Sequence, residues 1–226
     1  MRIKRMNASF FLFTLSTMAV RTCVKRAIDS VLDGYRPNVL SLDTETTGCG
    51  PGDVAVQVAL VELNPHREVV HTLNGYLHPP DGVEMKPGAQ AVHNISMEYL
   101  REHGEPDVTS FLNKVVDRIA EARADGRVVV AHNSSFDVAM LNRTLQAHGL
   151  NRRLKDGEVE CTMQKSKRIC NLKNKLGRPK PPKNEELFRF LHGRDPSEVE
   201  GPLHDACTDA TITALSYLEG RTRGWW

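Results

Sequence analysis

The sequence has few cysteines, and their arrangement suits neither a disulfide scaffold nor a zinc site. There are five among 226 residues, an odd number, with no C-x-x-C pair and no regular spacing. A small protein held together by disulfides and a zinc ribbon both fit this pattern poorly. We therefore expect reduced thiols, as in a cytosolic or organellar protein.

The N-terminal region lacks both acidic residues and an apolar run long enough to cross a bilayer. The first 28 residues contain six basic residues and no acid, and Ala8–Val20 is an apolar run of only 13 residues, whereas a spanning helix needs about 20. We assign residues 1–34 to an N-terminal extension with a helix at Val20–Leu32, a candidate targeting segment. An ordinary extension, a true start at Met6 or Met18, a transit peptide and a secretory signal all remain open. We expect an intracellular protein, cytoplasmic or organellar, with no membrane partner.

The remaining composition indicates one folded domain, residues 35–226. Hydrophobic residues make up 40% of the chain, which is enough to bury a core and argues against a wholly disordered protein. The net charge of +2 is uninformative as a total. No internal repeat is visible.

The hydrophobic pattern predicts a mixed sheet covered by helices. We expect strands at Asn38–Asp43, Val54–Leu63, Glu68–Leu77 and Arg127–Ala131. We expect helices at Ser96–Glu102, Val108–Ala124, Phe136–His148, Asn184–Leu191 and Ala206–Leu218. Because the strands first form a meander and then alternate with helices, the predicted fold class is α/β.

One stretch, Thr162–Lys183, carries eight basic residues and no acid. A solvated loop that aids solubility would account for these charges. A groove wall or flap that contacts phosphate would account for them equally well. The charge pattern alone leaves both interpretations open.

Acidic residues stand where a mixed sheet would expose them. Asp43 and Glu45 lie two apart in an extended segment, so both carboxylates point to one face. Asp137 follows the fourth strand, and Asp209 lies in the last predicted helix, five residues after His204, where both can face the same side. Carboxylates without a Cys or His pair favour Mg²⁺ or Mn²⁺ over Zn²⁺. Two such ions would support attack on a phosphodiester, and an imidazole can accept the proton of the attacking water.

Each of these residues also has a plainer interpretation. Asp43 could form a turn, Asp137 could satisfy a helix dipole, and His204 with Asp209 could be a polar helix face. The sequence contains three acidic motifs in this order: D-T-E-T-T-G, H-N-S-S-F-D and H-D-A-C-T-D. The plainer interpretation would have to hold by coincidence at all three.

These three motifs resemble the DEDD superfamily of 3′-to-5′ exonucleases, in the branch whose third motif reads H-x-x-x-x-D. The chain is similar to proofreading exonucleases of the kind found as the epsilon subunit of bacterial DNA polymerase III, from Val39 to Tyr217. The resemblance implies a ribonuclease-H-like mixed sheet flanked by helices. It also implies a general base at His204 and two metal ions bound by the four carboxylates: Asp43, Glu45, Asp137 and Asp209.

The resemblance extends to residues that would hold the terminal nucleotide. It implies that His93, in V-H-N-I, helps to hold this nucleotide and that Thr46 and Phe136 meet its sugar and base. On its own, His93 could equally be a loop histidine. Asn94 replaces a Gly common in the family, and Gly88 stands where some relatives have an acid. The choice between deoxyribose and ribose therefore stays open.

The expected function is metal-dependent 3′-to-5′ hydrolysis of single-stranded or frayed nucleic-acid ends, preferably DNA, with release of nucleoside 5′-monophosphates. The expected cofactors are two Mg²⁺ or Mn²⁺ ions, and a polymerase or another nucleic-acid enzyme is a candidate partner. Two alternatives remain: trimming of RNA 3′ ends, and a non-catalytic nucleic-acid-binding subunit of the same fold.

Overall fold

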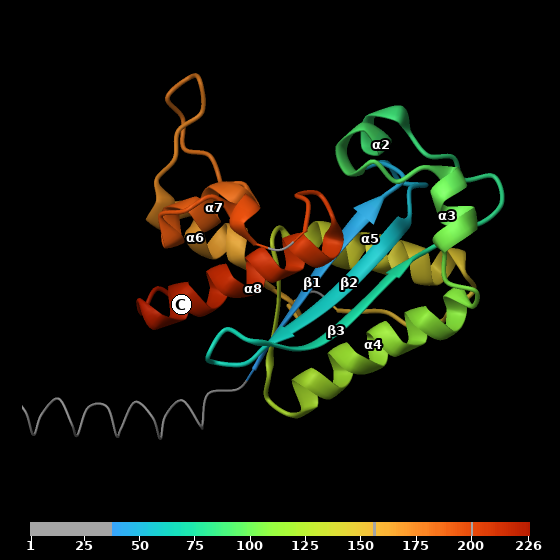
Figure 1. Cartoon of the computed structure of the whole chain (residues 1–226), viewed down its shortest axis with the longest axis horizontal. Helices are drawn as coiled ribbons and strands as arrows, with labels where there is room; N and C mark the ends of the chain where they lie inside the picture. The colour runs from blue at the N-terminus through green and yellow to red at the C-terminus, as the bar shows by residue number, and fades with distance from the viewer. Residues whose placement is uncertain (1–37, 156, 200) are drawn as a thin grey trace, which may run out of the picture. The chain divides into compact units, whose positions relative to one another are not determined.

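A five-stranded sheet of order β3–β2–β1–β4–β5 organises the computed structural model, which describes residues 38–155, 157–199 and 201–226 (Figure 1). β1 pairs antiparallel with β2 and β2 with β3, whereas β4 runs parallel to β1 and to β5. The strands are β1 (Val39–Thr46), β2 (Ala55–Leu63), β3 (Val69–Tyr76), β4 (Val128–Ala131) and β5 (Glu160–Cys161). This is the mixed sheet that the sequence predicts.

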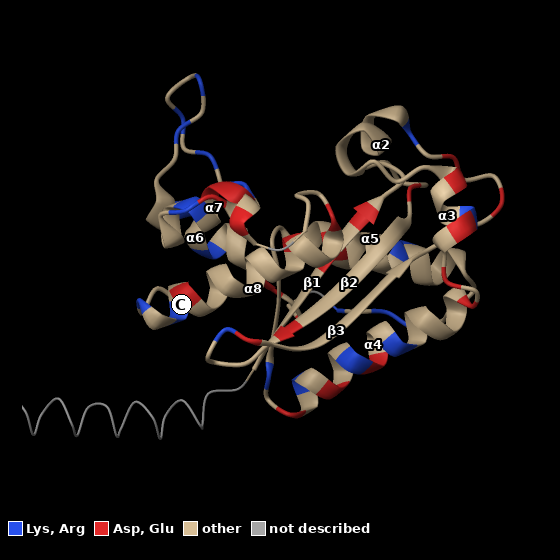
Figure 2. Ribbon diagram, viewed as in Figure 1, with Lys and Arg blue, Asp and Glu red and all other residues tan. Residues whose placement is uncertain are grey.

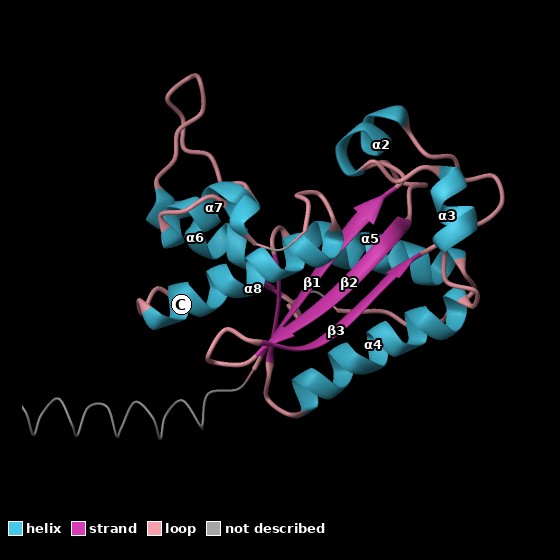
Figure 3. Cartoon of the chain, viewed as in Figure 1, coloured by secondary structure: helices cyan, strands magenta, loops and turns pink. Residues whose placement is uncertain are grey.

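Seven α-helices and one short 3-10 helix occupy the described part of the chain (Figure 3). They are α2 (Pro87–His93), α3 (Met97–His103), α4 (Val108–Ala124), α5 (Ser134–Ala147), α6 (Thr162–Cys170), α7 (Asn184–His192), the 3-10 helix Pro196–Glu198 and α8 (Ala206–Thr222). Among the described residues, no helix is long and apolar enough to cross a membrane. The N-terminal segment 1–34, with its predicted helix, lies outside the described residues.

The alternation of side chains along β1 separates two cores. Leu40 and Leu42 point to the face covered by α4 and α5, where they pack with residues such as Leu112 and Leu141. Val39 points to the opposite face, where it packs with Ala210 of α8. Odd-numbered positions of β1 therefore face α8, which decides where the predicted acids of this strand lie.

The structure corrects several predicted elements. β1 continues past Asp43 to Thr46, because its last residues still pair with β2 as far as Ala55. The sequence analysis missed α2 and β5, which are short. The basic stretch expected as a loop or flap begins as a helix, α6.

A buried ion-pair network holds β2 to α4 and β4. Glu62 is 2% exposed and accepts hydrogen bonds from Asn38, Arg118 and Arg127, at 2.8 Å from Asn38 Nδ2 and 3.0 Å from Arg127 Nη1. These contacts lower the pKa of Glu62 although burial acts in the opposite direction. The carboxylate therefore stays charged in the core.

Replacing Glu62 with Ala should lower the free energy of unfolding by about 3 kcal/mol, because the half-buried guanidinium groups of Arg118 and Arg127 would lose the buried carboxylate that they share and keep only exposed acidic partners. Chemical denaturation monitored by circular dichroism would measure the loss. Glu84→Ala is the matched control, since Glu84 is exposed and has no hydrogen bond or ion pair among the described residues. Equal stability of the two variants would contradict the prediction.

Candidate active site

Strand β1 and helix α8 bring three predicted carboxylates together. Asp43 and Glu45 lie on the face of β1 that α8 covers, and Asp209 lies in the first turn of α8. Ligand oxygens of all three side chains lie within 4.8 Å of one another. Residues 166 positions apart in the sequence thus form one cluster because α8 packs across β1.

The fourth predicted carboxylate approaches from the other side. Asp137 is 3% exposed in the first turn of α5, and its Oδ1 accepts a hydrogen bond of 2.9 Å from Thr44 Oγ1. After burial, the charge of Asp137 is the largest cause that raises the pKa of Asp43. Asp137 therefore lies beside Asp43, although it is not within the group of three mutually close carboxylates.

A sharp turn between β4 and α5 aims Asp137 at the cluster. Asn133 has a φ of 69°, in the left-handed region that Asn tolerates better than most residues. Helix α5 starts at the next residue, which places Asp137 in its first turn. The conformation of this turn therefore explains why Asn follows His in the motif H-N-S-S-F-D.

His204 lies outside the last helix, so the expectation that it shares a helical face with Asp209 is wrong. Asp205 caps α8 by accepting hydrogen bonds from two backbone N–H groups of the first turn, and the helix begins at Ala206. The backbone N–H of His204 donates to Asp209 Oδ2 at 3.1 Å, and its Nδ1 lies 4.0 Å from the same oxygen. Its side chain is 48% exposed. This imidazole is thus held next to the carboxylates and remains accessible to water.

Sequence reasoning missed two residues that build this site. Asp205 Oδ2 accepts a hydrogen bond of 2.7 Å from Gln57 Nε2, and Gln57 Oε1 accepts one from Ala206 N–H. An Asp directly before a helix is a recognisable cap signal, so Asp205 could have been found. Gln57 stands in an otherwise apolar strand, and no sequence pattern identifies its partner.

The residues implied for nucleotide binding are tied to one another. His93 is buried; its Nε2–H donates to the Thr46 carbonyl at 3.1 Å and its Nδ1 accepts from Ile95 N–H at 3.0 Å. Burial lowers the pKa of His93, in agreement with a neutral ring. Thr46 Oγ1 donates to the Gly48 carbonyl. Phe136 lies half-buried in the first turn of α5. Contacts of these side chains with a nucleotide remain a prediction.

Burial and mutual repulsion raise the pKa values of the clustered carboxylates. Burial is the largest cause in each case: it raises the pKa of Asp43 well above its usual value, that of Glu45 to about 8, that of Asp137 to about 7 and that of Asp209 to about 6. No Lys or Arg among the described residues forms an ion pair with these four. An all-oxygen set without a neutralising cation fits Mg²⁺ or Mn²⁺.

In a chelator, these carboxylates should make the protein less stable as the pH rises from about 5 to about 8. In the unfolded chain they ionise near pH 4, whereas the folded protein keeps Glu45 and Asp137 protonated up to about pH 8 and 7. Ionisation therefore favours the unfolded state over this interval. Divalent ions bound to the carboxylates would remove the repulsion, so the rise in melting temperature on adding Mg²⁺ or Mn²⁺ should be larger at the higher pH.

Paired melts with metal and with chelator would measure this difference at each pH. Buried histidines such as His132 have lowered pKa values and destabilise the fold at acidic pH. They do so with and without metal, so they cancel in the comparison. We expect the metal-induced rise to grow by about 4 °C, which corresponds to about 1–2 kcal/mol for a domain of this size. A rise that is the same at both pH values would contradict the prediction.

A cavity of about 390 Å³ opens next to the cluster. Its wall includes Asp43, Asp209 and His204 on one side and Met163, Pro182 and Lys183 on the other. The second group belongs to the basic stretch Thr162–Lys183. The cavity thus connects the carboxylates to the most basic segment of the chain.

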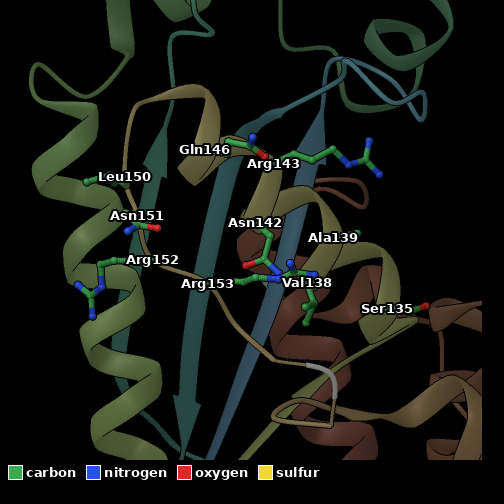
Figure 4. A pocket seen from close by; sticks show the side chains of 10 residues that line it. All are labelled: Ser135, Val138, Ala139, Asn142, Arg143, Gln146, Leu150, Asn151, Arg152 and Arg153. Carbon is green, nitrogen blue, oxygen red and sulfur yellow. The ribbon is translucent and has the colours of Figure 1, made fainter.

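A second cavity, of about 460 Å³, lies along the outer side of α5 (Figure 4). It is lined by none of the predicted site residues. Two of its arginines are already used within the chain: Arg143 donates to the Gly50 carbonyl, and Arg152 Nη2 contacts Asp117 Oδ1 at 2.7 Å. We assign no role in catalysis to this cavity.

Known proteins with similar sequences include a DNA polymerase subunit and a ribonuclease. The chain is 27% identical over 181 residues to DNA polymerase III subunit epsilon of Rickettsia felis, covering 79% of this chain and 71% of the relative. It is 29% identical over 127 residues to ribonuclease T of Shewanella frigidimarina, covering 53% of this chain. It spans 57% of the length of that ribonuclease T.

Solved structures confirm the ribonuclease-H-like α/β fold. Exonuclease I of E. coli in complex with a dT13 oligonucleotide has a TM-score of 0.66 at 19% identity, covering 83% of this chain and 42% of its own. A 3′-exonuclease described in 3′-end recognition of a histone mRNA stem-loop has a TM-score of 0.62 at 16% identity, covering 84% of this chain and 65% of its own. At these identities the likeness establishes the fold.

A protein-family model matches a similar share of the chain. The family model described as Exonuclease (RNase T) matches residues 40–217, from β1 to α8. This interval contains all three acidic motifs and the whole carboxylate cluster. The chain therefore belongs to this exonuclease family, the DEDD-type 3′-to-5′ exonucleases.

Proposed function

We propose that this protein is a two-metal-ion exonuclease that removes nucleoside 5′-monophosphates from single-stranded or frayed 3′ ends, with DNA as its preferred substrate. The observation that carries the proposal is the cluster of Asp43, Glu45 and Asp209 with Asp137 beside it. Four carboxylates that repel one another need bound cations to neutralise them. In an exonuclease, such cations would take part in hydrolysis of the phosphodiester.

The four carboxylates would bind two Mg²⁺ or Mn²⁺ ions. Bound there, the ions would supply positive charge for the attacking water and for the leaving 3′ oxygen. His204 would accept the proton of the water, since its ring is next to Asp209 and open to solvent. Asp205 and Gln57 would hold the loop that presents His204. The terminal nucleotide would contact three side chains: Phe136, Thr46 and His93.

The size of the cavity beside the carboxylates explains why unpaired 3′ ends should be preferred. The terminal nucleotide must enter a cavity of a few hundred Å³ to reach the carboxylates. A paired end must first open, which costs free energy that a single strand does not spend. The rate on a blunt duplex should therefore be lower than on the matching single strand.

Trimming of RNA ends is the second candidate, favoured by the likeness to ribonuclease T. Matched DNA and RNA oligonucleotides with a 5′ label would decide between the two, with Mg²⁺ or Mn²⁺ and with a chelator. A ladder that shortens from the 3′ end only with metal would support the proposal and identify the preferred sugar. No shortening of either polymer would leave a non-catalytic binding subunit. The likeness to polymerase subunits makes a polymerase the first partner to add in that case.

A further inference from the structure

The basic arm, which we define as residues 162–183, holds most of the excess positive charge of the protein. It contains eight basic residues and no acid, whereas the rest of the chain has 22 basic and 28 acidic residues. Figure 2 shows these cations on α6 and on the projecting hairpin that follows it. The rest of the chain is acidic in total, although residues 1–28 are also basic, and the arm forms a strongly basic surface within the described residues.

Five of the eight cations have no ion pair or hydrogen bond from their side chains among the described residues. Lys165, Lys180 and Lys183 each contact a Glu of the same domain. The unpaired ones are Lys167, Arg168, Lys173, Lys175 and Arg178, all exposed. Cations that only anchored the arm to the rest of the domain would form ion pairs with it. These five do not, so they are available to bind an anion from outside the protein.

The hairpin is an ordered structure. A bridge joins Lys173 to Pro179, and Asn174 Oδ1 accepts hydrogen bonds of 3.0 Å from the backbone N–H groups of Leu176 and Arg178. Gly177 supplies the left-handed residue of the turn, with a φ of 73°. The cations are therefore displayed on a fixed turn, which reduces the entropy lost when a ligand binds.

Both ends of the arm are joined to the catalytic motif by one half-buried histidine. His132 Nε2–H donates to the Pro182 carbonyl at 3.0 Å, and His132 Nδ1 accepts from Thr162 Oγ1–H at 2.9 Å. His132 directly precedes the turn that leads to Asp137. Met163, Pro182 and Lys183 of the arm also line the cavity that contains Asp43 and Asp209. The arm thus begins and ends beside the carboxylate cluster.

We infer that the basic arm binds the sugar–phosphate backbone of the same strand, upstream of the 3′ end held at the carboxylates. This inference rests on the proposed function. The exposed cations match a polyanion, and the arm that carries them begins and ends at the cavity of the carboxylates. Leu176, 77% exposed at the tip, is the one large apolar group among them and would lie against a base. Binding should thus be independent of sequence and sensitive to salt.

A variant with Lys173→Gln, Lys175→Gln and Arg178→Gln tests the inference in the full-length protein. We expect it to bind a labelled 20-nucleotide strand at least about 10-fold more weakly in chelator at 0.1 M salt, with a salt slope smaller by about 2. We also expect the ratio of kcat/KM for the 20-nucleotide strand to that for a trinucleotide to fall by about 10-fold. Only the longer strand reaches the hairpin.

The matched control replaces three exposed cations elsewhere that have no side-chain ion pair or hydrogen bond among the described residues: Lys114, Arg153 and Lys155, each by Gln. It changes the net charge equally and should retain binding and the length ratio of the wild type. Equal losses in the two variants, or none in either, would overturn the inference. If the wild type cleaves nothing, the proposed function fails, while anisotropy in chelator still decides whether the arm binds nucleic acid. Arm-dependent flotation with phosphatidylserine vesicles, without loss of nucleic-acid binding, would assign the arm to membranes and overturn the inference.

Discussion

Replacing Asp43 with Asn is expected to lower the exonuclease rate by about 10³-fold or more, which corresponds to about 4 kcal/mol of transition-state stabilisation. A carboxylate oxygen of Asp43 lies within 4.8 Å of oxygens of Glu45 and Asp209, and the charge of Asp137 raises its pKa, so Asp43 interacts with all three other carboxylates. Asn removes the negative charge and keeps the size of the side chain. Because the packing of β1 is unchanged, a lower rate would show that the negative charge of Asp43 is needed to bind the cations.

The measurement is single-turnover cleavage of a 5′-labelled strand with saturating metal. Asp81→Asn is the matched control, since Asp81 is exposed and has no hydrogen bond or ion pair among the described residues. The Asp43 variant should also melt at a higher temperature than the wild type in chelator at about pH 8, because one repelling carboxylate is gone. A variant that keeps a tenth of the wild-type rate would refute a role for Asp43 in metal binding.

Replacing His204 with Gln is expected to lower the rate by about 10²- to 10⁴-fold, the usual contribution of a general base. Gln can keep a hydrogen bond to water but cannot accept its proton. The metal-induced increase in melting temperature should persist, because the four carboxylates are intact.

Single-turnover rates at saturating metal, with paired melts in metal and in chelator, would measure both effects. His66→Gln is the matched control, since His66 is exposed in the turn between β2 and β3 and its side chain has no hydrogen bond or ion pair among the described residues. A His204 variant that also loses the metal-induced rise in melting temperature would assign the ring to positioning of the carboxylates. A rate within about threefold of the wild type would remove it from the mechanism.

The left-handed backbone of His204 adds a reason to treat this position as functional. Its φ of 62° is uncommon for a residue that is not Gly, Asn or Asp. The surrounding contacts maintain it: the backbone N–H bonds Asp209, and the next residue caps α8 and bonds Gln57. A conformation of this cost persists where neighbouring contacts require it, and such positions are frequent in active sites.

The sequence by itself predicted the long elements and the identity of the acidic residues. The apolar periodicity of α4 and the mostly apolar run of β2, interrupted by Gln57 and Glu62, need no partner to be recognised. Two carboxylates separated by one residue in a strand must share a face. Local patterns of this kind depend only on neighbouring residues, which is why the motifs at Asp43, Asp137 and Asp209 pointed to a metal site.

Only the tertiary structure decided where β1 ends, how His204 is held and which carboxylates meet. Pairing with β2 extends β1 through a Thr- and Gly-rich segment that reads as a turn. Packing of α8 on the odd-numbered face of β1 sets the 4.8 Å cluster, and Thr44 fixes Asp137 beside it. The two hydrogen bonds that join His132 to the ends of the basic arm span 30 and 50 residues. Contacts over such separations depend on the packing of the whole domain, which no local pattern records.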